Sequence, residues 1–316
     1  MNIENNQAAI LTHGLTKSFA GNVAVSGLDL AVQKGEMFGL VGPDGAGKST
    51  VIRLLCGILR ATSGSGSVAG HDLDKERNLI HGRIGYLSQN FTLYGDLTVD
   101  ENIEFFATIH GVKSFKPRRD QLLAFTRLAP FRGRLAQALS GGMKKKLALA
   151  CTLVHTPDII FLDEPSTGVD PVSRGEFWSI LSSILDQGVT VFMTTPYLDE
   201  AERCRRISLM YRGRIIMTGS PAEIKQAMPG AVYDLYCTDA PAVYSRLREN
   251  LPATSLTLYG DHLRLWAGGD SDARKTAARL KNEFGGTIDM VHADPSLEDA
   301  FVALLQKESI PREVLT

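Results

Sequence analysis

The sequence predicts an α/β fold, and three observations indicate it. A short apolar run over residues 37–41 leads through a glycine-rich loop into residues 51–56, whose apolar positions have helical spacing. A continuous apolar run over residues 159–162 is typical of a strand buried on both faces of a parallel sheet. Residues 98–155 lie between these runs and show helical spacing without a strand pattern. We therefore expect a helical subdomain, at about residues 90–155, inserted into a sheet domain.

The length and composition fit one large domain followed by a small one. The chain has 316 residues, of which 44% are hydrophobic and 22% are charged, as in ordinary globular proteins. The pattern changes near Gly230, so we place an N-terminal domain at residues 1–228 and a C-terminal α+β domain at residues 229–316, with a four-stranded sheet and helices on one face. Its strands are expected over residues 232–236, 255–259, 263–266 and 288–291, and its helices over residues 242–251, 273–284 and 297–305.

Charge and cysteine content argue against several classes of protein. The formal net charge is -1, so nothing indicates nucleic acid as a partner, and Lys144–Lys146 is expected to be a solvated helix face. The four cysteines are far apart and form no C-x-x-C pair, which favours a reducing cytoplasm over a disulfide or zinc framework. The polar first residues are no secretion signal, and no apolar stretch approaches the ~20 residues that cross a bilayer. We therefore expect any role at a membrane to require a membrane-embedded partner.

A glycine-rich loop joins the first apolar run to the helical positions that follow it. It consists of Gly42, Pro43, Asp44, Gly45, Ala46, Gly47, Lys48, Ser49 and Thr50, and it fits G-x-x-x-x-G-K-[ST]. Glycines let backbone N–H groups turn toward phosphate oxygens, and the new helix directs its positive end at the same anion. Lys48 can contact the outer phosphates, and the Ser49 hydroxyl can bind Mg²⁺. The loop therefore predicts a nucleoside triphosphate with Mg²⁺.

The segments around this loop carry strand patterns and two candidate side chains. We expect short strands over residues 10–12, 23–25, 28–32 and 84–89, and a Ser- and Gly-rich turn over residues 61–70. Phe19 is either a core residue or an aromatic that stacks on a base. Gln89 is either an ordinary surface residue or an amide at a strand end that ligates Mg²⁺ or positions water.

The helical block contains a second glycine-rich helix start. Thr98–Glu101 forms a capping box, and another helix is expected over residues 117–128. Ser140 can cap the next helix, whose first positions are Gly141 and Gly142. Because the glycines leave the first N–H groups bare, this segment is either an anion-binding helix start or a plain capped helix.

Two carboxylates follow the buried run at residues 159–162. Asp163 and Glu164 are costly at the end of a buried strand unless they serve a function. Near a phosphate loop, Asp163 can hold Mg²⁺ and Glu164 can polarise an attacking water, whereas the alternative is an exposed acidic turn. Beyond them we expect strands over residues 189–194, 207–211 and 214–217, and short helices over residues 197–202 and 221–224.

These motifs together resemble those of the ATPase subunits of ABC transporters, over residues 9 to about 225. Leu139–Gly142 is similar to the signature motif of that family, and the strand ending at Glu164 to its Walker B strand. Ser166–Asp170 resembles the D-loop, whose Asp170 would belong to the nucleotide site, and Phe19 matches the aromatic that stacks on the base. The resemblance implies a P-loop NTPase fold of the ABC ATPase type.

The C-terminal unit carries a second resemblance. Pro295–Phe301 is similar to a segment of the small domain appended to ABC-2 type drug-export ATPases, the daunorubicin-resistance group. Within that group the chain resembles the tandem multidrug-export ATPases of enteric bacteria. The resemblance implies ABC-2 type permease subunits as partners and a peripheral position on the cytoplasmic face of the inner (plasma) membrane.

The family also implies a head-to-tail dimer, with a second copy or a second ATPase domain, that holds ATP and Mg²⁺ between its subunits. One subunit would supply Lys48, Ser49, Gln89, Asp163 and Glu164, with Ser49, Gln89 and Asp163 toward the metal, and the other would present Ser140, Gly141 and Gly142 to the γ-phosphate. Closure on ATP would push on the permease through the helical subdomain, near residues 89–96.

One position departs from the family pattern. The family has a histidine after the strand that here ends at Thr195, and this chain has Pro196 instead. Proline has neither a side-chain donor nor a backbone N–H. We therefore expect this site to bind ATP and to hydrolyse it slowly, with the signature motif serving a competent partner site. The alternative is that Glu164 is sufficient for hydrolysis and that Pro196 lowers the rate of hydrolysis by only a modest factor.

Three functions compete on this basis. The first is an energy-coupling ATPase of a drug or multidrug exporter. The second is a soluble ABC ATPase that acts on ribosomes or DNA, but the chain has neither two ATPase halves nor a long heptad coil before the signature motif. The third is a non-catalytic, ATP-sensing regulatory half that pairs with a competent ATPase, which Pro196 favours.

Overall fold

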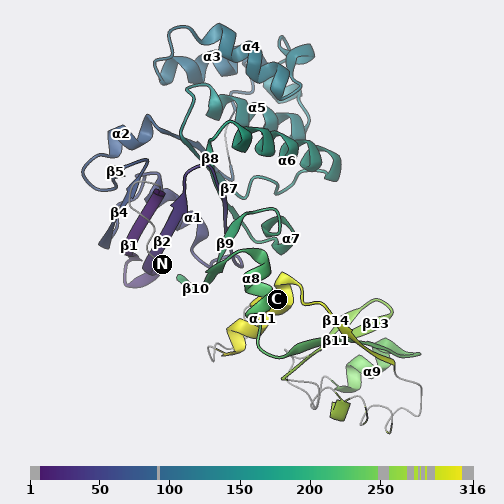
Figure 1. The fold of residues 1–316 in the computed structure, drawn as a ribbon. Coiled ribbons are helices and arrows are strands. Elements are labelled where there is room, and N and C mark those ends of the chain that lie inside the picture. The colour runs from purple at the N-terminus through teal and green to yellow at the C-terminus, as the bar shows by residue number, and fades with distance from the viewer. Residues whose placement is uncertain are drawn as a thin grey trace. The chain divides into compact units, whose positions relative to one another are not determined.

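A six-stranded sheet forms the centre of the first part of the chain in the computed structural model (Figure 1). Its strand order is β10-β9-β3-β8-β7-β6, and the pairs β9/β3, β3/β8, β8/β7 and β7/β6 are parallel. The strands are β3 (Met37–Val41), β6 (Ile84–Leu87), β7 (Ile159–Asp163), β8 (Thr190–Thr195), β9 (Arg206–Tyr211) and β10 (Arg214–Gly219). Every residue of β3, β7 and β8 is buried, which confirms the predicted α/β fold with a buried parallel sheet.

The structure describes residues 8–90, 93–247, 256–268, 274–276, 278, 282 and 289–307. The chain divides into two units, Met1–Ile215 and Ile216–Thr316. The boundary at residues 228–229 remains a prediction from the sequence.

A second, antiparallel sheet lies in the first unit, with the order β2-β1-β4-β5. Its strands are β1 (Ala8–Phe19), β2 (Asn22–Gln33), β4 (Ser63–Val68) and β5 (His71–Asp72). The three short strands expected before residue 33 are therefore two long strands, and shifts of register interrupt their pairing. The interruptions explain why the alternation in the sequence appears broken into pieces.

The predicted turn over residues 61–70 is wrong, because most of this segment is strand β4, paired with β1. Its glycines allow the two backbones to approach closely. A Cβ on Gly64 would lie 2.3 Å from the carbonyl oxygen of Gly14, and one on Gly66 would lie 2.7 Å from that of Leu11. Residues that usually mark a loop are here required by strand packing.

Helices of the first unit pack against the six-stranded sheet, and the first two of them also contact the antiparallel sheet. They are α1 (Lys48–Leu55), α2 (Arg77–His81), α6 (Pro171–Asp186) and α7 (Leu198–Ala201). The apolar side of α1 packs with residues of β2, β7 and β8 in one hydrophobic core. Phe192 lies in that core between Phe38 and Phe161, with ring centroids 5.7 and 5.6 Å away. The core fixes α1, and hence the loop before it, against the carboxyl ends of the strands.

The helical subdomain consists of α3 (Val99–Ile109), α4 (Phe115–Phe125) and α5 (Gly141–Leu153), with two short 3-10 turns at Ala129–Phe131 and Ala136–Ala138 (Figure 1). The predicted capping box at Thr98 and Glu101 is confirmed. The second helix starts two residues before the predicted position and ends at Phe125. The expectation of a solvated face at Lys144–Lys146 is wrong for Lys146, which is buried and lies 2.7 Å from a carboxylate oxygen of Glu176.

The second unit contains a four-stranded antiparallel sheet, as predicted, with the order β12-β13-β11-β14. The strands are β11 (Ala231–Tyr236), β12 (Leu256–Tyr259), β13 (His262–Ala267) and β14 (Asp289–Ala293), and the helices are α8 (Pro221–Gln226), α9 (Ala240–Leu247) and α11 (Leu297–Lys307). Arg264 on β13 joins the sheet to α11, because its guanidinium contacts both Asp234 and Asp299. Most of the predicted helix at residues 273–284, and both Ser255 and Ile288, lie outside the described residues.

Candidate active site

The phosphate loop connects β3 to α1 and is held by close backbone contacts on both sides. A Cβ on Gly42 would lie 2.1 Å from the carbonyl oxygen of Met210, and one on Gly47 would lie 2.4 Å from that of Ala24. Gly47 also has a φ of 106° and is the N-cap of α1 without any side-chain cap. Only glycine satisfies both the packing and this backbone conformation. The first turn of α1 has no acidic residue, which leaves its positive end suited to an anion.

Lys48 places its ammonium group against the loop that precedes it. Its Nζ donates hydrogen bonds to the carbonyl oxygens of Gly42 and Pro43, at 2.8 and 3.1 Å. It also lies 3.4 Å from Oε1 of Glu164 and 3.8 Å from the exposed carboxylate of Asp44. Lys48 is only 4% exposed, so its ammonium group is held against the carbonyl groups at the start of the loop and is largely shielded from solvent.

Asp163 lies at the end of β7, where two hydroxyl groups converge on it. Ser49 Oγ and Thr194 Oγ1 donate to the same carboxylate oxygen, Oδ1, at 3.0 and 2.7 Å. Asp163 is buried, so the exposed acidic turn is excluded. Carboxylate and hydroxyl oxygens are the donors that Mg²⁺ prefers, so the residues present fit this ion. The sequence did not single out Thr194, although it ends the neighbouring buried strand.

Glu164 follows Asp163 in a backbone conformation that is unusual for a side chain of its size. Its φ is 49°, in the left-handed region, and its N–H donates to the carbonyl and the hydroxyl oxygens of Thr194. The carboxylate lies between two partners: Lys48, and Gln89, whose Nε2 donates to Oε2 at 3.0 Å. The structure thus brings Gln89 and Glu164 together, as the resemblance implies, because β6 and β7 are adjacent parallel strands.

A buried glutamate that the sequence analysis missed connects two segments beside the site. Glu200 is 2% exposed, and its two carboxylate oxygens accept hydrogen bonds from Ser166 Oγ and, at 2.8 Å, from Thr195 Oγ1. The carbonyl oxygen of Thr195 in turn accepts from the N–H of Gly42 at 3.4 Å. Pro196 is the next residue, so it is tied to the phosphate loop through its neighbour. The acidic residue just after a buried strand was the available signal.

Lys145 is a second functional candidate that the sequence did not indicate. Its Nζ donates to the backbone oxygen of Gln89 at 3.4 Å. Burial lowers the pKa of this ammonium group, while the charges of Asp163 and Glu164 act in the opposite direction. Lys145 therefore links α5 to the segment after β6 and adds positive charge near the two carboxylates.

The signature segment is built separately from the phosphate loop. Ser140 caps α5, accepting from the N–H of Met143 at 3.3 Å, as predicted. A Cβ on Gly142 would lie 2.2 Å from Oγ of Ser173, whose N–H donates to Oδ1 of Asp170. Gly142 and Asp170 are thus neighbours. Within the described part of the chain, no hydrogen bond or ion pair joins Ser140–Gly142 to the phosphate loop.

Phe19 ends β1 and is 44% exposed, so it is not a core residue. Lys17 Nζ lies 4.9 Å from the centroid of its ring. Ala24, on the strand that follows, contacts Gly47 through its carbonyl oxygen. The β1–β2 hairpin therefore contacts the phosphate loop through Ala24, and the Phe19 ring on the same hairpin is exposed.

Comparison with known proteins adds three sequence relatives. A family profile described as "ABC transporter" matches residues 25–167. A probable multidrug ABC transporter ATP-binding protein (YbhF) of Escherichia coli is 47% identical over 71% of the chain, which spans only 40% of that relative's length. The daunorubicin/doxorubicin resistance ATP-binding protein of Streptomyces peucetius is 40% identical, over 94% of the chain and 92% of its own length. The Nod factor export ATP-binding protein I of Paraburkholderia xenovorans is 34% identical, over 96% and 98%.

Solved structures of ATP-binding proteins from ABC transporters have a similar fold. The structure of cbiO1 from Clostridium perfringens, described as part of an ABC transporter complex, has a TM-score of 0.65 at 25% identity, over 78% of this chain and 97% of its own. A nucleotide-free ATP-binding cassette from an ABC transporter has a TM-score of 0.63 at 26% identity, over 69% and 94%. Across the described ranges, no helix combines the length and the apolar character that are needed to cross a bilayer.

Proposed function

The chain belongs to the ABC transporter family of ATP-binding proteins, and we propose that it couples ATP binding and hydrolysis to export. It would work on drug-like molecules through separate ABC-2 type permease subunits, from the cytoplasmic face of the inner (plasma) membrane. Relatives named for multidrug transport, daunorubicin/doxorubicin resistance and Nod factor export support an export role.

The convergence of Lys48, Ser49, Asp163, Glu164 and Gln89 is the observation that carries this proposal. The phosphate loop and Lys48 would bind the phosphates of ATP, and Ser49, Asp163 and Gln89 would hold Mg²⁺. Bound Mg²⁺ would supply positive charge that neutralises the outer phosphates. Glu164, oriented by Gln89, would accept a proton from the attacking water.

A second ATPase subunit would complete the site. Ser140, Gly141 and Gly142 form a helix start with no acidic residue in its first turn, and they are not joined to the phosphate loop of the same chain. Such N–H groups suit the γ-phosphate on a neighbouring subunit. The partner would be a second copy or the second ATPase domain of a longer protein, and Asp170 would lie beside this contact because it neighbours Gly142.

The direct test compares ATP binding and export in matched lysine variants. Lys48→Ala should abolish efflux in cells and weaken binding of radiolabelled ATP to the purified protein by at least tenfold. Lys75→Ala is the control, because it removes an exposed lysine that lies outside the loop. Efflux that survives Lys48→Ala would contradict the exporter function.

A regulatory, slowly hydrolysing subunit is the second candidate, and Pro196 favours it. The residue before Pro196 contacts the phosphate loop, so the side chain at position 196 is suited to reach the γ-phosphate. Pro196→His should raise turnover by about tenfold or more if a donor is missing there. Tyr197→His, one residue further on an exposed position, should not. Equal turnover in the Pro196→His variant and the wild type would contradict the degenerate site, and tight ATP binding without hydrolysis in the presence of the permease would favour it.

A further inference from the structure

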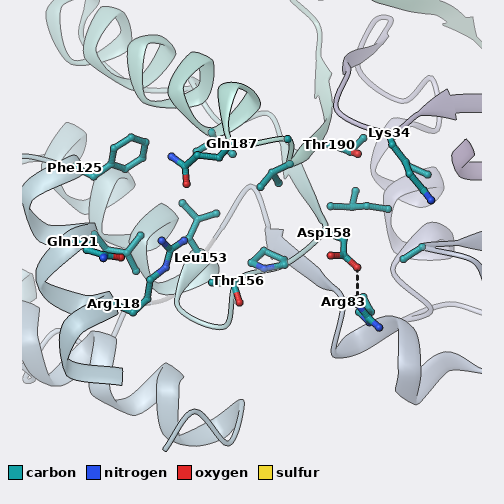
Figure 2. A pocket seen from close by; sticks show the side chains of 18 residues that line it. Lys34, Arg83, Arg118, Gln121, Phe125, Leu153, Thr156, Asp158, Gln187 and Thr190 are labelled. Carbon is teal, nitrogen blue, oxygen red and sulfur yellow. Dashed lines mark hydrogen bonds and ion pairs between the residues drawn. The ribbon is translucent and has the colours of Figure 1, made fainter. Parts of the chain in front are cut away.

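A cavity of about 820 Å³ lies at the end of the parallel sheet opposite to the candidate active site (Figure 2). Asp158 and Ile159, which lead into β7, and Thr190, which begins β8, form one side of it. Helix α4 forms the other side with Arg118 and Phe125. The cavity therefore lies between the helical subdomain and the sheet, away from the phosphate loop.

The charged groups that line this cavity are mostly positive. They are Lys34, Arg83 and Arg118, against one carboxylate, that of Asp158. Arg83 and Asp158 pair with each other at 3.1 Å, as the dashed line in Figure 2 marks. The acidic group of the lining is thus already engaged by Arg83 and is not paired with Arg118.

Arg118 is a lining cation for which the described residues provide no ion pair. Its Nε is buried and has no hydrogen-bond partner within the described part of the chain, and burial lowers the pKa of its guanidinium. The carboxylates near α4 are engaged elsewhere, since Asp100 and Asp120 both pair with Arg119 at 3.2 Å. An anionic group in the cavity would supply the partner that this guanidinium lacks.

The rest of the lining combines apolar side chains with uncharged polar ones. Leu122 and Phe125 of α4, Leu153 at the end of α5, and Ile184 of α6 contribute to the same cavity. Figure 2 shows Arg118 and Gln121 on the side of α4, with Leu153 and Thr156 between them and the pair Arg83–Asp158. A cavity of this size, with an apolar strip beside polar groups, can hold a small molecule that has both kinds of surface.

We propose that this cavity binds an amphipathic anion: a small molecule with one carboxylate, phosphate or sulfonate group on an apolar body. Arg118 receives the anionic group with its planar guanidinium, a geometry suited to such oxyanions. The apolar body lies along Leu122, Phe125 and Leu153. The proposal is independent of the transport function, because binding at this site requires neither nucleotide nor permease.

The test uses two fluorescent probes that differ by one charged group. The full chain, with its nucleotide site saturated with ADP, is titrated with the sulfonate 8-anilinonaphthalene-1-sulfonate and with the uncharged N-phenyl-1-naphthylamine. The variants are Arg118→Met, which removes the charge at similar length, Arg118→Lys, and the control Lys116→Gln, an exposed cation on the same helix that does not line the cavity.

The sulfonate probe should bind the wild type and lose at least tenfold in affinity with Arg118→Met. Arg118→Lys should keep part of that affinity, and Lys116→Gln should keep all of it. The uncharged probe should bind weakly and be unaffected by Arg118→Met. Equal binding of the sulfonate by the wild type and the Arg118→Met variant would overturn the proposal, and so would equal affinity of the wild type for both probes. If Arg118→Met does not fold, a loss of affinity in Arg118→Lys with Lys116→Gln unchanged supports the proposal, and no loss overturns it.

Discussion

Two helices in the first unit begin beside glycine, and their starts are built differently. α1 follows Gly47 and has no side-chain cap, whereas α5 is capped by the hydroxyl of Ser140. Beside α1, Asp163 and Glu164 supply acceptor oxygens and Lys48 supplies a charge. Beside the start of α5, Gly142 packs closely against Ser173 instead. The first start therefore has acceptor oxygens and a cation beside it, whereas the second has only its backbone N–H groups and, under the proposed function, would need a partner subunit to complete a site.

The largest expected effect comes from a substitution that removes the proton acceptor beside α1 and leaves α5 unchanged. Glu164→Gln should lower the rate of ATP hydrolysis by about a hundredfold or more, because the proton acceptor is removed. ATP affinity should stay within about twofold, since the amide keeps the size and the contacts of the side chain. Phosphate release and equilibrium binding measure the two quantities. Glu104→Gln, on an exposed position of α3, is the control, and comparable turnover in the two variants would refute the role of Glu164.

The second largest effect is expected from a substitution that disturbs the close packing at the start of α5. Gly142→Ala would push a methyl group to 2.2 Å from Ser173 Oγ, which costs about 1–3 kcal/mol of unfolding free energy. ATP-driven dimerisation, measured by sedimentation velocity, should weaken while binding of ATP to the monomer is kept. Ser173→Gly should restore much of the loss in the double variant. Gly141→Ala is the matched control for stability, since nothing lies within 4 Å of its added Cβ.

A smaller effect separates the two kinds of cap. Ser140→Ala should lower the unfolding free energy by about 1 kcal/mol, because the N–H of Met143 loses its acceptor. Ser140→Thr should retain most of the stability. Urea unfolding measures both variants, and an unchanged midpoint in Ser140→Ala would show that the cap contributes nothing.

The smallest expected effect is on ATP affinity and comes from a substitution in the β1–β2 hairpin, which contacts the loop before α1. Phe19→Ala should weaken ATP binding by about 0.5 kcal/mol, roughly twofold, as expected for an exposed stacking ring. Phe19→Trp should bind at least as well as the wild type. Val23→Ala, an exposed apolar position on the same hairpin, is the control in the calorimetric titration. Equal losses in Phe19→Ala and Val23→Ala would exclude a specific role in stacking.

The parts of the site that follow local rules could be predicted from the sequence. The phosphate loop, the cap at Ser140 and the acidic pair at Asp163 and Glu164 each depend on neighbours within a few positions. The placement of Gln89 in the same site as Glu164 came from the family resemblance, and the structure explains it, because the carboxyl ends of the adjacent parallel strands β6 and β7 share an edge. Local patterns were enough for the other residues.

The parts that depend on distant packing were missed. β4 looked like a turn because its glycines serve contacts with Gly14 and Leu11, which no local window contains. Glu200 joins Ser166 to Thr195, and its burial depends on three segments meeting. The Lys146–Glu176 pair arises only when α5 packs on α6. Such residues look like ordinary polar surface until the tertiary structure brings their partners together.

The left-handed backbone of Glu164 has a consequence for which residues can occupy this position. At a φ of 49°, any side chain with a Cβ costs on the order of 1 kcal/mol, which glycine would recover. A change to glycine would relieve this backbone strain, but it would also remove the proton acceptor and leave Lys48 and Gln89 without their carboxylate partner. The strained backbone is therefore compensated by contacts that only an acidic side chain of this length can make.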